Sequence, residues 1–395
     1  MKFNNADTII IGGGLIGLTI AFFLGKIGLK VIIIDKNKIT SKQSIDFDFR
    51  TTAISEGSKK ILDSNNIWRY LQKNSQKIEK IKVFDRYATN NLDFINPKQS
   101  KVLGYIVENK YIKKALISEI KKYKNIKIIE DSVIQDLTTS DNEVTLKTDE
   151  SHFKSKLLIA SDGKNSFIRK LENQSLFKKK YDQSALVLNI VHEKNHMNTA
   201  YEIFYKSGPL AILPMKNHSN RKFKSSIVWS HSVDFINSLN SCDDSFLCKI
   251  IDEKTYNYIG QVEKIIKKKV FNLSAHLNTS IAKNRVIYVG DSAHSIHPIA
   301  GQGWNLGIRD SDCLQKILIE TLGLGIDIGS KFVMKKYNDE RHFDMLSLYQ
   351  ITDKFNFIFS KDDLITKGFR GIGFEIINAN PTLKKFITSY AMGER

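Results

Sequence analysis

Glycines clustered after the first apolar run are the residues most suited to chemistry. The run Thr8–Ile11 leads into Gly12-Gly13-Gly14-Leu15-Ile16-Gly17, which fits the pattern G-x-G-x-x-G. In such loops the first glycine permits a tight turn, the second lets the backbone approach a pyrophosphate, and the third brings a helix close to a strand. We therefore predict that Gly12, Gly14 and Gly17 hold the phosphates of a dinucleotide at a helix N-terminus.

The elements around these glycines complete the pattern. Asp7–Ile11 predicts a buried strand, Leu18–Ile27 a helix packed on a sheet, and Val31–Ile34 a second buried strand. Asp35 ends the second strand, where its carboxylate would accept hydrogen bonds from a ribose hydroxyl. A glycine-rich turn alone can serve only backbone geometry, but the full order favours dinucleotide binding. It does not distinguish FAD from NAD.

Two further acids follow apolar runs. Asp162 comes after Leu157–Ala160, and Asp291 comes after Val286–Val289. Ligands of parallel α/β sheets bind outside the carboxyl ends of the strands, so both acids could reach one ligand. The alternative for either acid by itself is a cap in a strand-to-helix turn.

A glycine-rich loop after Asp291 points to a flavin. Residues 297–307 read His-Pro-Ile-Ala-Gly-Gln-Gly-Trp-Asn-Leu-Gly and open a predicted helix. The exposed N–H groups of such a helix start would stabilise the negative charge of a reduced flavin. His294 and His297 lack a third nearby ligand, so we predict no metal site.

These segments resemble the FAD-dependent aromatic hydroxylases of the para-hydroxybenzoate hydroxylase fold. The closer similarity is to the branch that hydroxylates the ring in ubiquinone biosynthesis. The most specific match is the Gly290-Asp291 segment with residues 297–307 and Asp310. Residues 48–55, residues 103–109 and the final Ala391-Met392-Gly393 also match, so the resemblance covers essentially the whole chain.

The resemblance assigns roles by position. It places Gly12, Gly14 and Gly17 at the pyrophosphate and Asp35 at the adenosine ribose. It places Asp162 beside the phosphates and Asp291 at the ribityl chain. The remaining cofactor contacts that it implies are Arg50, Asn109, Gly301, Gln302, Gly303 and Asn305. Pro298 and His297 would lie near the reactive edge of the flavin. No side chain is assigned to catalysis, because the flavin can carry the chemistry itself.

The implied activity is that of a flavoprotein monooxygenase, an oxidoreductase. Reduced FAD would form a C4a-hydroperoxyflavin with O2 and hydroxylate the aromatic ring of a (poly)prenylated phenol, with NAD(P)H as electron donor. Two alternatives stay open. One is a hydroxylase of a small soluble phenol or aromatic acid, and the other is a non-catalytic FAD-binding scaffold of a biosynthetic complex. The sequence indicates neither the ring carbon nor the choice between NADH and NADPH.

The predicted fold class is α/β. We expect a discontinuous, Rossmann-like FAD-binding domain of residues 1–75, 100–180 and 275–330. Residues 76–99 and 181–274 would form an inserted, mainly antiparallel β domain for the substrate, because short strand-like runs alternate there with polar turns. Residues 331–395 would be a C-terminal helical region.

The C-terminal region is rich in phenylalanine and isoleucine from Phe355 to Ile377, with interleaved Lys361, Lys367 and Arg370. Such a surface could meet a membrane or a partner protein. We favour helices packed on the core, because phenylalanines at helical spacing are usually buried.

Composition excludes several classes of protein. The 395 residues carry a formal charge of +18, but no nucleic-acid motif accompanies it, so we expect no nucleic-acid partner. Three cysteines form no zinc-type pair and no signal peptide opens the chain, which predicts a reducing, cytoplasmic location. No run of eighteen apolar residues occurs. Peripheral contact at the inner face of a membrane remains an alternative.

Overall fold

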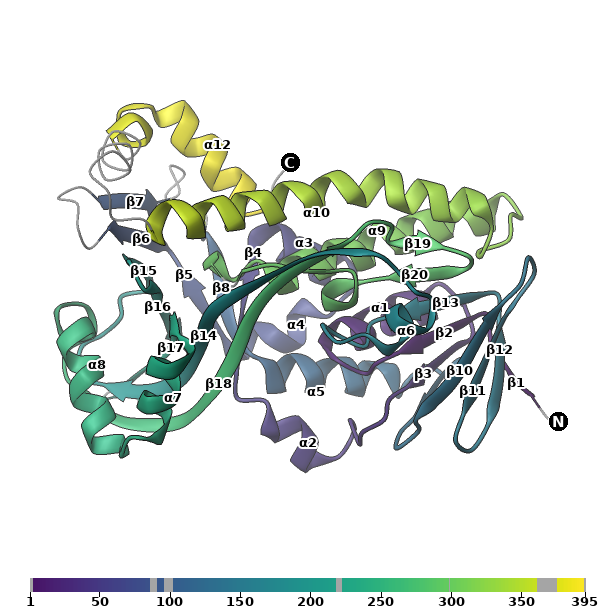
Figure 1. Cartoon of the computed structure of the whole chain (residues 1–395), viewed down its shortest axis with the longest axis horizontal. Helices are drawn as coiled ribbons and strands as arrows, with labels where there is room; N and C mark the ends of the chain where they lie inside the picture. The colour runs from purple at the N-terminus through teal and green to yellow at the C-terminus, as the bar shows by residue number, and fades with distance from the viewer. Residues whose placement is uncertain are drawn as a thin grey trace.

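The structure is a computed structural model of the chain. It describes residues 3–85, 91–95, 102–217, 222–297, 299–360 and 375–393. The chain folds around two large sheets, which two long strands connect (Figure 1).

The first sheet carries the predicted dinucleotide motif. Its strands lie in the order β19-β20-β13-β2-β3-β9, and all neighbours are parallel except β19 and β20. Every residue of β2, β3, β13 and β20 is buried, as expected for a sheet covered on both faces. The bounds are β19 Ala282–Lys283, β20 Val286–Tyr288, β13 Leu157–Ala160, β2 Thr8–Ile11, β3 Val31–Ile34 and β9 Ile126–Ile129.

Helices α1 Leu15–Lys26, α5 Asn109–Ile120 and α9 Gly303–Gly323 pack near this sheet. Helix α1 lies between the other two and is apolar over most of its length, with Leu18, Ile20 and Phe23 fully buried. An apolar helix of this kind is stable only when neighbours cover it on several sides.

The second sheet has the order β21-β18-β14-β17-β16-β15-β6-β7, and its neighbours are antiparallel except β15 and β6. The expected mainly antiparallel sheet is therefore confirmed, with β6 and β7 at its edge. The bounds are β21 His294–Ser295, β18 Val262–Asn278, β14 Leu176–His192, β17 Phe223–Ser232, β16 Gly208–Met215, β15 Thr199–Tyr205, β6 Lys80–Asp85 and β7 Asn91–Ile95.

The long strand β14 was predicted only in part, and the long strand β18 was not predicted. In β18 three lysines, Lys267–Lys269, follow one another in a half-exposed strand, so the sequence shows little apolar alternation there. Both strands run through the positions at which we divide the chain, residues 180/181 and 274/275. The two predicted domains thus share continuous strands, and the division itself remains a prediction.

Two smaller sheets complete the strands. One has the order β4-β8-β5 and the other β1-β12-β11-β10. Their bounds are β4 Thr51–Ser55, β8 Gly104–Glu108, β5 Ser75–Ile78, β1 Phe3–Asn5, β12 His152–Ser155, β11 Val144–Thr148 and β10 Ile134–Thr139. The shorter helices are α2 Lys42–Phe47, α3 Glu56–Ser64, α4 Trp68–Leu71, α6 Phe167–Leu171, α7 Val233–Ser241 and α8 Asp244–Ile259. Single turns of 3-10 helix are η1 Gln72–Asn74, η2 Gly290–Ser292 and η3 Ile299–Gly301.

The C-terminal part contains α10 Lys331–Ser360 and α12 Pro381–Ala391. Helix α10 runs along the molecule in Figure 1, and its Val333, Tyr337 and Met345 are buried in the core. The expected packing on the core is therefore present in α10, although Phe357 is exposed. The apolar residues Leu364, Ile365, Phe369, Ile372 and Phe374 lie outside the described residues. Among the described helices, none combines the length and apolar character needed to cross a bilayer.

Candidate functional site

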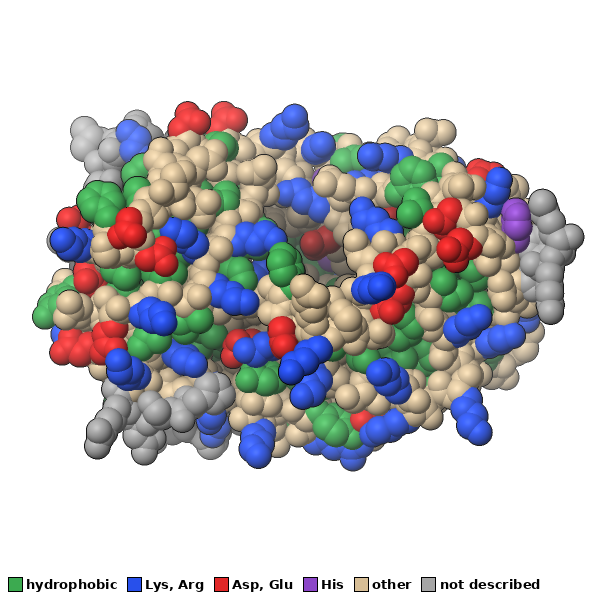
Figure 2. Space-filling model, turned by 90° about the horizontal axis from the view of Figure 1, so that it is seen from below, with side chains coloured by type: hydrophobic (Ala, Val, Ile, Leu, Met, Phe, Trp, Pro, Cys, Tyr) green, Lys and Arg blue, Asp and Glu red, His purple; other side chains and the backbone are tan. Residues whose placement is uncertain are grey.

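The predicted glycines and acids meet at one edge of the first sheet. Strands β2, β3, β13 and β20 are parallel, so the residues that follow them share the carboxyl edge. These residues are Gly12, Asp35, Asp162 and Asp291. Figure 2 shows the molecule hollowed near the middle of one face, with acidic side chains inside and Lys and Arg side chains around the rim.

The three glycines of the motif differ in what surrounds them. Gly12 has φ +97°, and a Cβ there would lie 2.5 Å from the Ser161 carbonyl oxygen. A Cβ on Gly17 would collide with the Gly12 carbonyl oxygen. Around Gly14, at the start of α1, a Cβ would meet no protein atom within 4 Å. Gly12 and Gly17 thus serve the fold, whereas Gly14 leaves open space at a helix N-terminus, where a phosphate group fits.

Asp35 ties the glycine loop to the end of β3. Its carboxylate accepts hydrogen bonds from the N–H groups of Gly13, at 2.7 Å, and Asn37, at 2.8 Å. A cavity of about 600 Å³ opens beside it, lined by Gly14, Lys113 and residues of α2. Burial lowers the pKa of Lys113, against the opposing charges of Asp35 and other acids. Lys113 was not predicted, because a lysine on a helix face carries no motif.

Asp162 combines the two roles considered for it. One carboxylate oxygen caps α6 by accepting from the N–H groups of Phe167, at 2.7 Å, and Ile168, at 3.2 Å. The other oxygen, Oδ1, is buried and has no hydrogen-bond partner among the described residues. A buried carboxylate oxygen without a donor is unfavourable, so this atom fits a ligand that supplies one.

Asp291 lies in the turn η2 that follows β20. The residue is exposed to solvent, yet the protein surrounds its carboxylate closely enough for burial to raise its pKa. The positive charges of Arg50 and Lys164 act in the opposite direction. A carboxylate that is both enclosed and reachable by water lies in a hollow, as a ligand-binding acid must.

Arg50 and Asn109 meet through Asp48. The Arg50 guanidinium donates two hydrogen bonds to the Asp48 carboxylate, both at 2.7 Å, and Asn109 Nδ2 donates to it at 3.0 Å. Burial opposes the charge of Asp48, but Arg50 and Asn109 outweigh it and lower the pKa. Arg50 also lies over the Phe271 ring of β18, 5.3 Å from its centroid. Asp48 belongs to a matched segment but was not singled out, because its role is to hold two other residues.

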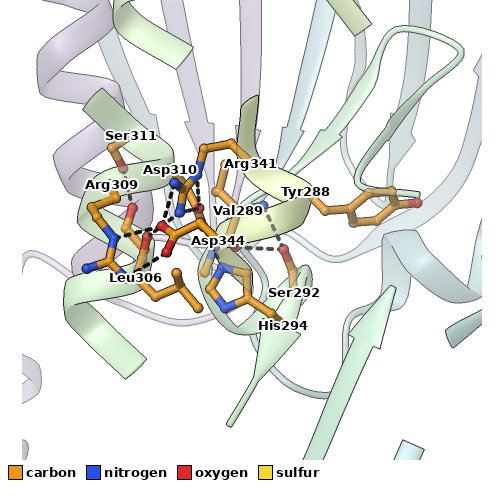
Figure 3. Close-up of polar contacts among 12 residues, drawn as sticks. Tyr288, Val289, Ser292, His294, Leu306, Arg309, Asp310, Ser311, Arg341 and Asp344 are labelled. Atoms are coloured by element: carbon orange, nitrogen blue, oxygen red, sulfur yellow. Dashed lines mark hydrogen bonds and ion pairs between the residues drawn. The ribbon is translucent and has the colours of Figure 1, made fainter. Parts of the chain in front are cut away.

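A buried ion network holds the turn that carries Asp291 (Figure 3). Asp310 of α9 accepts from His294 Nε2 at 2.6 Å and from the Gly290 N–H at 2.9 Å. Burial opposes the charge of Asp310, but His294 and Arg341 outweigh it and lower the pKa. His294 and the Gly290 N–H thus share one carboxylate oxygen of Asp310, which ties the turn to α9.

The network continues into the C-terminal helix. Arg341 of α10 donates to Asp310 at 2.9 Å and to Asp344 at 2.7 Å, and Arg309 of α9 donates to Asp344 at 2.9 Å (Figure 3). Asp310, Arg341 and Asp344 are all buried. No sequence pattern predicted the roles of Arg341 and Asp344, because residues of another helix, α9, complete their contacts.

The glycine-rich loop reaches the same edge. Gly301 and Gln302 precede α9, and Gly303 begins it, with no protein atom within 4 Å of a Cβ built there. Asn305, on the first turn of α9, uses its amide within the protein. Its amide is buried, accepts from the Ser55 N–H at 3.0 Å and donates to the Ala53 carbonyl at 2.8 Å, so it fixes the loop on β4. Pro298 lies outside the described residues.

His297 is buried beside β14. Its Nε2 lies 3.4 Å from Gln183 Oε1, and its ring contacts Tyr181 edge-on at 5.1 Å. Burial lowers the pKa of His297 to about 4, so the imidazole is neutral at physiological pH. Tyr181 donates to Asp353 of α10 at 2.9 Å, and a cavity of about 380 Å³ opens beside Tyr181 and Gln183. Neither Tyr181 nor Asp353 belongs to a recognisable motif.

The site therefore suits a dinucleotide. It offers an open helix start at Gly14, an orphaned buried oxygen on Asp162 and an enclosed carboxylate on Asp291. Comparison with known families decides which dinucleotide. Residues 5–345 match the FAD binding domain family. The chain belongs to that family. Its cofactor is FAD, as predicted.

Curated relatives agree with this membership. The chain is 28% identical over 389 residues to the ubiquinone hydroxylase UbiL of Rhodospirillum rubrum, covering 98% of this chain and 90% of that protein. It is 26% identical to the 3-demethoxyubiquinol 3-hydroxylase of Escherichia coli, covering 97% of each chain. These similarities confirm the resemblance to FAD-dependent hydroxylases and the assignment of the chain as an FAD-dependent monooxygenase.

Solved structures confirm the fold. The p-nitrophenol 4-monooxygenase PnpA of Pseudomonas putida superposes with a TM-score of 0.80 at 16% identity, covering 100% of this chain and 99% of that one. PqsL of Pseudomonas aeruginosa, a probable FAD-dependent monooxygenase, superposes with a TM-score of 0.77 at 14% identity, covering 94% and 100%. The predicted α/β class is therefore correct.

Proposed function

We propose that this flavoprotein hydroxylates the aromatic ring of a prenylated phenol in ubiquinone biosynthesis. The observation that carries the proposal is the convergence of Gly14, Asp162 and Asp291 on one sheet edge, beside a loop whose neighbours form an apolar sheet face. The full-length similarity to hydroxylases of ubiquinone biosynthesis supports the choice of substrate.

The chain's own residues bind and orient the cofactor. Gly12, Gly14 and Gly17 would surround its pyrophosphate, with Asp35 at the adenosine ribose and Asp291 at the ribityl chain. Arg50 and Asn109 would line its length, and the segment Gly301–Asn305 would lie at the flavin ring. Bound FAD, once reduced by NADH or NADPH, activates O2 for transfer of one oxygen atom to an electron-rich ring.

The second sheet would exclude water and hold the substrate. Its flavin-side face carries apolar residues such as Leu213, Phe204 and Met215, which suit an aromatic ring and a prenyl chain. His297 would position the loop rather than take a proton, because its pKa of about 4 makes it a weak base.

A comparison of two substrates tests this function. The purified protein with FAD would receive NADH or NADPH and either a prenylated phenol or the same phenol without its prenyl chain. We expect a hydroxylated product, detected by mass spectrometry, and a higher kcat/KM for the prenylated ring. A preference for the soluble phenol would favour the first alternative. Flavin binding with no hydroxylation of either phenol would favour the scaffold.

The same substrate suggests contact with a membrane surface. Exposed apolar side chains Phe357 of α10 and Phe386 of α12 lie in a region that also carries Lys384 and Lys385. A basic and apolar surface of this kind binds anionic lipids. We expect the protein to co-sediment with vesicles that contain anionic lipid and to stay in the supernatant with neutral vesicles. Equal behaviour with both would contradict this contact.

A further inference from the structure

Glu202 is a carboxyl group in the substrate-facing sheet that the cofactor site does not use. On β15, Tyr201 and Ile203 belong to the core cluster packed with α7 and α8. Side chains alternate along a strand, so Glu202 shares the opposite face with Ala200 and Phe204.

This opposite face looks onto the flavin loop. Phe204 belongs to a buried cluster with Ile299 of the loop and stacks on Phe359 of α10, with ring centroids 3.9 Å apart. Ala200 belongs to a cluster that includes Ala53, and a Cβ on Gly301 would lie 3.2 Å from the Ala53 side chain. Glu202 lies between these two contacts.

The neighbours of Glu202 offer it no partner. In register it pairs with Val83 of β6 and Ala211 of β16, and Ala211 pairs with Val228 of β17. The Glu202 side chain makes no hydrogen bond or ion pair with any residue in the part of the chain that the structure describes. Val83, Ala211 and Val228 are small and apolar, so they offer the Glu202 carboxyl group no hydrogen-bond partner on this face of the sheet.

The protonation state of Glu202 follows from its burial. The residue is half-buried, yet burial alone raises the pKa of its carboxyl to about 8. At physiological pH the group is therefore mainly neutral, with one O–H to donate and one oxygen to accept. No charge among its described neighbours shifts the pKa of Glu202. The titratable side chains on the same face, or on elements packed against it, are Asp85, Tyr181, Lys224, His297 and Asp353.

Stability of the fold does not explain why a glutamate occupies position 202. A polar side chain that is enclosed without a partner is unfavourable, and an apolar residue would fill the same position at lower cost. Two polar atoms on the same face, Ser226 Oγ and Asn189 Oδ1, are buried and likewise have no partner among the described residues. Unpaired polar atoms facing a cofactor loop are typical of a surface that binds a polar ligand.

We propose that Glu202 recognises the substrate, with its carboxyl group hydrogen-bonded to an oxygen substituent of the aromatic ring above the flavin loop. This inference rests on the proposed function and names the residue that selects the ring. A hydroxylated ring offers an oxygen that both donates and accepts, which matches a neutral carboxyl group.

Two variants and a control test the proposal. Glu202→Gln keeps a donor and an acceptor, whereas Glu202→Met keeps the length without either. Glu253→Met makes the same change at an exposed position of α8, on the other side of the sheet. FAD content, thermal midpoint and the KM for a prenylated phenol would be measured for each holoenzyme. We expect unchanged FAD content in all, a KM within threefold of wild type in Glu202→Gln and Glu253→Met, and about a tenfold higher KM in Glu202→Met.

A pH series separates recognition from a structural role. Ionisation of Glu202 turns its carboxyl group from a donor and acceptor into a charged acceptor only, so we expect wild-type affinity for the phenol to change between pH 7 and pH 9. Affinity of Glu202→Gln should stay constant over this range. An unchanged KM in Glu202→Met would overturn the proposal while leaving the hydroxylase function intact. A wild-type protein that hydroxylates no phenol would overturn the function, and with it this role of Glu202.

Discussion

At the scale of single residues, the three glycines of the G-x-G-x-x-G motif have different surroundings. A Cβ at Gly12 or Gly17 would strike the protein backbone, but a Cβ at Gly14 would enter empty space. The sequence pattern predicted all three as cofactor residues. The pattern could not show which of the three glycines has open space beside it, because the spacing of a motif does not reveal the atoms that surround each residue.

Substitution of Gly14 by valine should therefore remove FAD without unfolding the protein. The backbone at Gly14, with φ −69°, suits any residue, so we expect a loss of stability below about 1 kcal/mol. The valine side chain would occupy the space of the pyrophosphate. The flavin absorbance of the purified variant measures the effect.

Gly17→Ala is the matched control for Gly14→Val. Its Cβ would collide with the backbone, so we expect it to cost about 1–3 kcal/mol of unfolding free energy, measured by urea denaturation. Full flavin content in Gly14→Val would contradict the assignment of the motif.

Other residues of the site were not singled out from the sequence. Asp48, Lys113 and Glu202 each depend on neighbours that only folding brings close, such as Arg50 for Asp48. Asn305 carried a signal, because it stands in the matched loop, but its amide is used to fix the loop on β4. A motif thus indicates which residues belong to the site, but it does not indicate which atoms each side chain contacts.

At the scale of elements, the sequence predicted the apolar strands and not the long charged ones. Strands β3 and β13 have the expected bounds, and β2 begins one residue after the expected start at Asp7, because each is a continuous apolar run. Strand β18 was not predicted, because its half-exposed surface carries lysines. The contact between α9 and α10 through Asp310 and Arg341 was not predicted either, because charged pairs between helices produce no periodic pattern in the sequence.

This contact should matter for both stability and the cofactor. Asp310→Asn leaves the buried Arg341 without one of its carboxylate partners, and removal of one partner of a buried pair costs about 3–5 kcal/mol. We expect such a loss of unfolding free energy in urea, together with weaker FAD binding, because the single amide oxygen of asparagine cannot accept from both the Gly290 N–H and Arg341.

Asp339→Asn on α10 serves as the control for Asp310→Asn. Its ion pair with Lys335 is exposed, so we expect a change below about 1 kcal/mol. Equal effects of the two substitutions would show that the buried network does not hold the turn.

At the scale of the whole molecule, the long strands β14 and β18 run from the second sheet toward the first (Figure 1). Three buried histidines have lowered pKa values: His276 lies on β18, and His196 and His297 lie outside both strands. Burial lowers the pKa of His276 to about 3, with a further contribution from Arg169, and burial lowers the pKa of His196 and His297 to about 4. An unfolded histidine has a pKa of about 6.5.

Stability should consequently fall in mild acid. Between about pH 6.5 and pH 4 the unfolded chain binds protons at these histidines and the folded chain does not, so the folded state is favoured above this window and loses its advantage as the pH decreases. We expect roughly 2 kcal/mol of unfolding free energy to be lost for each histidine, measured in urea at pH 7.5 and at lower pH. His297→Gln should reduce the slope. A constant unfolding free energy over this range would show that these histidines are not held neutral.

The most direct test of the central claim follows the oxygen atom. The purified FAD-bound protein would be supplied with a prenylated phenol, NADH or NADPH, and O2 labelled with the heavy isotope, in unlabelled water. We expect a ring-hydroxylated product that carries one labelled oxygen atom, with consumption of one reduced nicotinamide for each product molecule. An unlabelled product, or oxidation of the nicotinamide with no hydroxylated ring, would contradict the assignment of this protein as a flavin-dependent ring hydroxylase.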